Sequence, residues 1–302
     1  MSTTPEGGPP TSSSIFDLGY RRYEGGRTGR AGTLLTLYVH ALRSGFGLGR
    51  RTSSKIFPFL FAIFAFVPAV IQLGVAAIVS GVDEHIDLFK HEDYFSYVQI
   101  VLVLFCATVA PELVGRDQRS RLLTLYFSRS VSRLDYVLAK FAAVISAMLV
   151  LTLGPQALLF VGNGMAGDDL AGYLSANVDL VLPILAGSLV LSAAIGAVGL
   201  VIAAYLPRRA YATAAIVGSF VLTLAAANIL METADTAIAR FSLLVSPLAW
   251  DGMIDWFFGV EPGQGDVLGD AGFGGWVYLL ASLVMILAGF LLTLVRFRRV
   301  SA

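Results

Sequence analysis

Charged residues and cysteine are both scarce in this chain of 302 residues. Charged side chains make up 14% of it and hydrophobic ones 56%, whereas a soluble domain has about 25% and about 45–50% respectively. This composition argues against a water-soluble protein. The single cysteine, Cys106, excludes a disulfide or a cysteine-based zinc site within one chain. The net charge of zero argues against a nucleic-acid partner, because such a partner requires a basic surface.

Lysine and histidine are too few for the common nucleotide-binding and metalloprotease motifs. None of the three lysines follows a glycine, so the G-x-x-x-x-G-K phosphate loop is absent, and so is H-E-x-x-H. We therefore expect no catalytic residues and no cofactor bound directly by this chain. His85 and His91 lie among five acidic residues in the 81–95 loop. A divalent cation there is one interpretation, but a solvated acidic loop is more common, and no metal is expected.

Long apolar runs are what the sequence has in abundance. About 20 apolar residues cross a bilayer as a helix, because backbone polar groups in lipid must be paired within the segment. Six runs qualify, at 56–80, 96–115, 138–162, 180–206, 211–230 and 275–295. The predicted fold is all-α, a polytopic membrane protein with six transmembrane helices. Residues 1–30 are expected to form a disordered cytoplasmic segment, and residues 31–302 to form the membrane domain.

The few charges are distributed unevenly among the segments that join these runs. The N-terminal segment, the 116–140 loop, the 207–210 turn and the C-terminus together hold 19 of the 21 Lys and Arg residues. The three alternate loops hold the other two, together with 15 of the 21 acidic residues. The positive-inside rule places the basic segments in the cytoplasm. Both termini are therefore predicted to be cytoplasmic.

Two further segments have the pattern of short helices outside the spans. Residues 33–46 carry apolar side chains at helical spacing and precede several basic residues. This predicts an amphipathic helix at the cytoplasmic interface, with a cytosolic helix packed on other protein as the alternative. Residues 237–258 are apolar but interrupted by Pro247, Asp251 and Asp255. We expect a re-entrant or interfacial pair of short extracellular helices broken at Pro247, with a further span as the alternative.

The loop between the second and third runs combines arginines with an apolar stripe. The stripe has helical spacing and consists of Leu123, Phe127, Val131 and Leu134. A short amphipathic helix cannot bury such a face alone, so it lies on lipid or in a partner's groove. A basic loop that skims the membrane is the alternative. Ser132, followed three residues later by Asp135, is a variant of the capping box and predicts a new helix that continues into the third run.

Two polar or small-residue features lie inside the runs. Glu112 is the one acid within an apolar run, and Arg116 lies one helical turn away. We expect a structural ion pair between them, with a transport role for Glu112 as the alternative. The fourth run carries a stripe of small residues, formed by Gly187, Ser188, Ser192 and Gly196. Such stripes allow close helix packing, within one subunit in the favoured interpretation and at a dimer seam in the other.

Together these features resemble the permease subunits of type-2 ATP-binding-cassette (ABC) exporters. The resemblance is carried by Glu112, Gly115-Arg116-Asp117, Ser120-Arg121-Leu122-Leu123-Thr124-Leu125-Tyr126, Ser128 to Ser132, Arg133 and Lys140. The family's usual glycine–threonine and glutamate before the leucines are replaced by Ser120-Arg121, and Arg129-Ser130 stands where proline is common. The segment IFDLGYRRYEG, residues 15–25, resembles the start of actinobacterial permeases of this kind.

The resemblance implies a permease of a bacterial cell membrane that forms the pathway of an exporter and dimerises, as a homodimer or a heterodimer. Two copies of a separate ATPase subunit would bind ATP and magnesium. The helix at about 118–128 would be the coupling helix, which contacts that ATPase through Arg119, Arg121, Leu122, Leu123, Tyr126 and Phe127. The alternative is an ATP-independent carrier or a membrane assembly factor, although no span has a central charge for ion coupling. The apolar spans slightly favour hydrophobic or amphipathic cargo.

Overall fold

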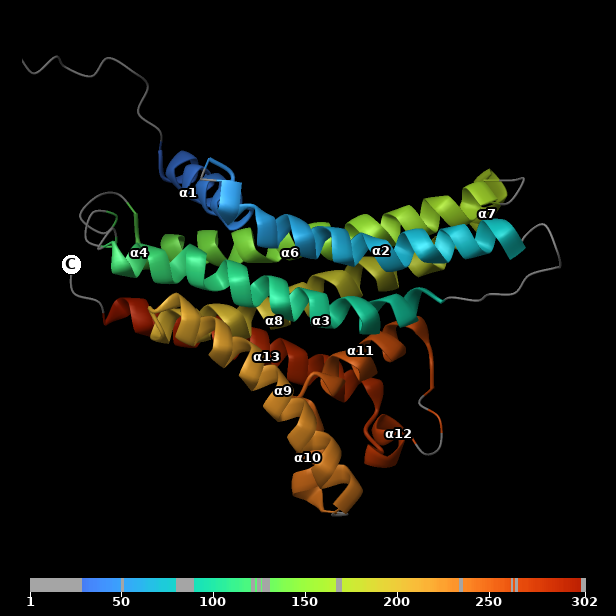
Figure 1. Ribbon diagram of the computed structural model, residues 1–302. Coiled ribbons are helices and arrows are strands. Elements are labelled where there is room, and N and C mark those ends of the chain that lie inside the picture. The colour runs from blue at the N-terminus through green and yellow to red at the C-terminus, as the bar shows by residue number, and fades with distance from the viewer. Residues whose placement is uncertain are drawn as a thin grey trace, which may run out of the picture.

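The structure is a computed structural model, and it is helical throughout the part of the chain that it describes (Figure 1). It describes residues 29–49, 52–79, 90–120, 123, 126, 131–166, 170–233, 236–261, 263 and 266–299. The six long helices are α2 (Ile56–Val79), α3 (His91–Ala110), α6 (Arg133–Ala166), α8 (Val181–Tyr205), α9 (Arg209–Thr233) and α13 (Gly275–Arg298). Six helical stretches built on them are long and apolar enough to cross a membrane. The predicted all-α fold with six candidate spans is therefore confirmed.

Shorter helices connect these six and mark the two ends of the bundle. They are α1 (Arg30–Gly45), η1 (Thr52–Ser54), η2 (Pro111–Gly115), α4 (Arg116–Arg119), α7 (Leu170–Ala176), η3 (Val178–Leu180), α10 (Ala237–Val245), α11 (Leu248–Phe258) and α12 (Val267–Ala271). Helices α1 and α4 and the C-terminal end of α13 lie together at one end, and α7 lies at the other (Figure 1). We call the first end the basic end, because the elements that lie there carry Arg43, Arg116, Arg119 and Arg298.

The core of the bundle lies between α3, α6 and α8, which pack on one another. Close approach between helices depends on glycine at several points, of which two concern α8. A Cβ atom on Gly289 of α13 would lie 2.8 Å from Cβ of Ala197 in α8. A Cβ on Gly199 of α8 would collide with the sulfur of Cys106 in α3. The small side chains of these helices are therefore what brings their backbones close together.

Helices α10 and α11 form a sharply bent pair. Their axes differ by 79° across a break at Ser246 and Pro247, so the predicted helical pair broken at Pro247 is confirmed. The Gln99 side-chain amide of α3 donates to the Pro247 carbonyl at 3.1 Å, and Trp250 is buried in the core. The pair therefore turns back towards the bundle and fixes α11 against α3.

The predicted helix at 33–46 is present as α1, three residues longer at its N-terminal end. Its apolar stripe contacts protein: Leu37 and Ala41 are buried, and α1 packs along α6. The Tyr38 hydroxyl donates to Oγ of Ser146 in α6 at 2.9 Å. Leu35 and Val39 are exposed on the other side. The helix thus has one face on the bundle and an apolar face still open.

Candidate functional site

The candidate site is built around the start of α6 at the basic end. Ser132 caps this helix, because its Oγ accepts from the Asp135 amide at 3.1 Å and its own amide donates to Asp135 Oδ2 at 3.4 Å. This reciprocal pair is the predicted capping box, and α6 begins at the next residue, Arg133. A local sequence signal therefore fixes where α6 begins.

Asp135 also ties α1 to α6. The guanidinium of Arg30 in α1 donates from Nε to Oδ2 of Asp135 at 3.0 Å and from Nη2 to Oδ1 at 2.8 Å. This fork geometry is the strong form of an arginine–carboxylate contact. The carboxylate raises the pKa of the Arg30 guanidinium above its usual value, first by hydrogen bonding and then by its charge. The first helix of the described chain is thus attached at the point where α6 starts.

A buried polar cluster joins α4 to α6, which lie on either side of the arginine-rich loop, our name for residues 118–132. Nζ of Lys140 in α6 lies 2.8 Å from Oδ2 of Asp117 in α4, and both side chains are less than 10% exposed. The hydroxyl of Tyr136, which is fully buried, donates to the same Asp117 oxygen at 3.0 Å. Lys140 also stands over the Tyr136 ring, 5.3 Å from its centre. Asp117 and Lys140 therefore join α4 directly to α6.

The turn between α8 and α9 packs on the same region. The Gln118 side-chain amide donates to the Ala204 carbonyl at 3.0 Å, and Nη1 of Arg119 donates to the Pro207 carbonyl at 2.8 Å. A Cβ on Gly115 would lie 3.2 Å from the Pro207 carbonyl oxygen, so only glycine fits there without a shift. The start of the arginine-rich loop is therefore held by the last turn of α8 and by the turn that follows it.

The ion pair that the structure gives for Glu112 differs from the predicted one. Oε1 of Glu112 lies 3.0 Å from Nη1 of Arg209, at the start of α9. The predicted partner, Arg116, is exposed on α4. The α8–α9 turn packs on η2 and brings Arg209 to Glu112 across the bundle. Sequence spacing within one helix contains no information about such a neighbour.

The predicted coupling residues divide into three groups. Arg119 is exposed and anchored to Pro207. Leu123 is only 4% exposed and belongs to the chain's own core, while Tyr126 is half-buried with its ring 6.1 Å from that of Tyr136. Arg121, Leu122 and Phe127 lie outside the described residues. Leu123 is therefore a structural residue of this chain, and its burial makes it a poor probe of a partner's surface.

The predicted packing residues of α8 all face protein. Gly187, Ser188, Ser192 and Gly196 are buried. A Cβ on Gly196 would lie 2.9 Å from Cγ1 of Val144 in α6, and one on Gly187 would lie 3.4 Å from Cζ of Phe95 in α3. These contacts lie within one chain.

Sequence reasoning missed three residues of the site: Asp117, Tyr136 and Arg30. A signal for the first existed, since Asp117 and Lys140 stand just before and just after the loop, but nothing local indicates that the two meet. His91 pairs its Nδ1 with Oε1 of Gln156 at 2.6 Å. No group of three or more metal-ligating side chains occurs within the described ranges. The contacts described at the basic end thus tie α1, α4, α6 and the end of α8 to one another.

Comparison with known proteins adds no identification. No protein-family model matches the chain, and no curated protein matches it. The function must therefore be argued from the residues and their arrangement.

Proposed function

We propose that this chain is the transmembrane permease subunit of a type-2 ABC exporter, coupled to a separate ATPase subunit at its basic end. The observation that carries the proposal is the clamp on the arginine-rich loop. Asp117, just before the loop, is bonded to Lys140 in α6 after it. Gln118 is bonded to the last turn of α8 and Arg119 to the α8–α9 turn. A force applied to this loop would therefore be transmitted to α3, α6 and α8 together.

The charges support a partner on this side of the membrane. Described basic residues at this end include Arg43, Arg116, Arg119, Arg208 and Arg298. In our proposal this end is cytoplasmic, in a bacterial cell membrane. A cytoplasmic ATPase with acidic side chains around an apolar groove fits the loop. ATP binding to that partner would shift the permease between two arrangements of its helices.

A second copy of the permease is part of this proposal. Long faces of α2 and α9 are open in the single chain, and a Cβ on Gly218 of α9 would meet nothing within 4 Å. Glycine without a neighbour in an apolar helix fits a close approach by another helix. Two copies would then enclose a pathway for hydrophobic or amphipathic cargo.

The first experiment tests the partner. The chain is co-expressed with a candidate ATP-binding subunit, sought among the genes next to its own, and the complex is isolated through a tag on the permease. The double variant Arg119→Glu and Arg121→Glu is expected to lose most of the bound ATPase subunit and of the ATP hydrolysis that the permease stimulates. The matched control is Arg299→Glu, a charge reversal at the same end outside the loop. Unchanged binding in the double variant would contradict the proposed coupling site.

The second experiment tests the orientation. Cys106 is buried, so single cysteines can be placed at the exposed positions Ser120 and Ser175 in the native background. A membrane-impermeant maleimide applied to intact cells is expected to label Ser175→Cys and to leave Ser120→Cys unlabelled until the membrane is opened. The reverse pattern would place the arginine-rich loop outside and would remove the basis for a cytoplasmic ATPase.

A further inference from the structure

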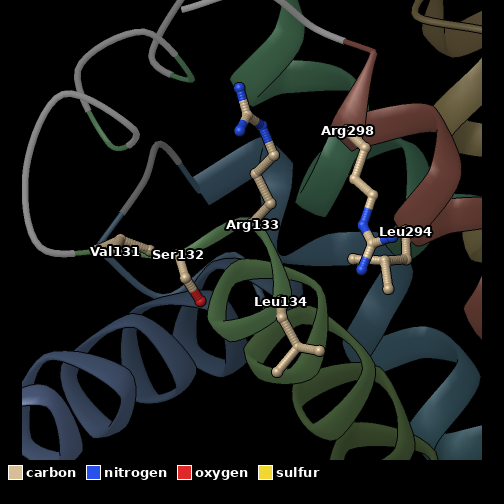
Figure 2. A pocket seen from close by; sticks show the side chains of 6 residues that line it. All are labelled: Val131, Ser132, Arg133, Leu134, Leu294 and Arg298. Atoms are coloured by element: carbon tan, nitrogen blue, oxygen red, sulfur yellow. The ribbon is translucent and has the colours of Figure 1, made fainter.

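The charges at the two ends of the bundle are arranged differently. At the basic end, around the cavity between the start of α6 and the end of α13, the guanidinium groups of Arg133 and Arg298 point away from each other (Figure 2). At the opposite end, where α3 begins, acidic side chains from three segments act on one another through their charges. We call these residues the acidic cluster: Glu92 and Asp93 of α3, Asp251 and Asp255 of α11, and Asp266 just before α12. Like charges therefore converge where α11 lies beside α3.

Helix α11 is attached to the bundle by apolar contacts and is joined to α10 at a sharp break. Trp250 is buried in the core. Gly252 lies so close to α13 that a Cβ atom on it would be 2.7 Å from Cδ2 of Tyr278. At Pro247 the axes of α10 and α11 differ by 79°. The break allows α11 to change its distance from α3 without unwinding α10 or any of the six long helices.

The edge of α11 that faces α3 carries the acids. The Ser96 hydroxyl of α3 donates to Oδ1 of Asp251 at 3.4 Å, which is long for such a bond. Asp255 stands one helical turn from Asp251 and so lies on the same face of α11. Nζ of Lys90 lies 3.9 Å from Oε1 of Glu92, but the lysine side chain is 62% exposed, and water screens its charge. Attraction at this edge is weak, whereas ionised carboxylates there repel one another.

The two acids of α11 change their charge near neutral pH. Burial, and then the charge of Asp255, raises the pKa of Asp251 to about 7. Burial, and then the charge of Asp266, raises the pKa of Asp255 to about 6. An aspartate in water has a pKa of about 4, so the arrangement with α11 against α3 binds protons more tightly than one with the two helices apart. Contact between α11 and α3 therefore weakens as the pH rises from about 4 to about 7.

The remaining charged and titratable groups come from the other helices packed around α11. On α13 this group is Tyr278, on α10 it is the exposed Arg240, and on α8 it is Tyr205 in the last turn, far from α11. A guanidinium stays charged and a phenol stays neutral between about pH 5 and about pH 8. His91 of α3 pairs its Nδ1 with Oε1 of Gln156 in α6 at 2.6 Å and so faces away from α11. A pH effect on α11 is therefore expected to come from the acidic cluster.

We propose that the acidic cluster is a pH-sensitive latch between α11 and α3. When the carboxyl groups of Asp251 and Asp255 are protonated, α11 is docked on α3, and when both are ionised, α11 moves away. The pH of the compartment at this end would thus set the position of α11. The inference is independent of the ATPase partner and of the side of the membrane on which this end lies.

The position of α11 is measured by double electron–electron resonance on the full-length chain in lipid nanodiscs. Spin labels are attached to Trp256→Cys in α11 and Tyr97→Cys in α3, both exposed positions, while the native Cys106 is buried. One short distance is expected at about pH 5. At about pH 8 the population at a longer distance should be at least about tenfold larger, with the midpoint between about pH 6 and about pH 7. A reference pair within the bundle, Tyr97→Cys with Val161→Cys of α6, should give the same distance at both pH values.

Matched variants separate the titration of the acidic cluster from other effects of pH. The double variant Asp251→Asn with Asp255→Asn keeps the shape of both side chains and should stay docked at about pH 8, and each single variant should lose part of the change. Asp270→Asn, an exposed acid of α12 outside the cluster, should keep the pH dependence of the wild type. Circular dichroism and gel filtration check that each bundle is intact. A wild-type distance that does not change with pH, a double variant that still opens at about pH 8, or an equal change in the reference pair would each overturn the proposal.

Discussion

Helices α8 and α9 are adjacent in the chain, each 25 residues long and similarly apolar, yet they have opposite surroundings. In the most apolar stretch of α8, 67% of the residues are buried, against 17% in α9. Both contain glycine, serine and alanine. In α8 the glycines touch α3 and α6, whereas Gly218 of α9 meets nothing. Small residues therefore permit close packing, but they pack closely only where the fold places another helix beside them.

The largest effect is expected at the inner ion pair. Lys140→Met leaves Asp117 as a buried carboxylate without its cation, although Tyr136 still donates to it. Breaking one side of a buried pair costs about 3–5 kcal/mol, so the melting temperature in detergent should fall by at least about 6 °C. Removing both charges, as Asp117→Leu with Lys140→Met, should recover most of the loss. If the double variant is no more stable than Lys140→Met, the loss of stability does not come from leaving the Asp117 carboxylate buried without its cation.

Helix packing gives the next effect. Gly289→Leu drives a side chain against Ala197, including its backbone carbonyl at 3.2 Å from the new Cβ. Overpacking of this kind costs about 1–3 kcal/mol, measurable as a lower melting temperature of the single chain in detergent. The matched control is Gly218→Leu on α9, where the space is open, and it should be as stable as wild type. Similar losses in both variants would mean that α9 is packed as closely as α13.

Much of this architecture was predictable because it depends on local signals. The six spans follow from the length of the apolar runs, the α6 start from Ser132 and Asp135, and the bent pair from Pro247. The contacts of the site depend instead on which helices become neighbours. Glu112 meets Arg209 and Lys140 meets Asp117 only after the bundle has formed. The burial of Leu123 was unpredictable for the same reason. The sequence of its apolar stripe does not indicate whether the stripe contacts lipid, a partner or this chain's own core.

The cap of α6 provides a smaller test of a local signal. Ser132→Ala removes the oxygen that accepts from the Asp135 amide, and losing such a cap costs about 1 kcal/mol. A modest fall in the melting temperature is expected, together with faster hydrogen exchange at the first amides of α6. Ser132→Asp should restore most of the loss, because aspartate is an equally good cap. If Ser132→Asp is as unstable as Ser132→Ala, the role of the serine hydroxyl is not capping.

The smallest effect is expected at the ion pair that reaches the outer helix. Arg209 is 50% exposed and Glu112 19% exposed at the side chain, so water and salt screen their attraction. Exposed pairs contribute about 0–1 kcal/mol. Arg209→Met should therefore lower the melting temperature by no more than about 4 °C, less than Lys140→Met does. The comparison is made at low and at high salt, since a screened pair should lose its remaining contribution as salt is added. A loss of stability as large as that of Lys140→Met would mean that α9 is bound to the bundle chiefly through this pair. The contrast between firmly packed inner helices and a loosely attached outer helix would then be wrong.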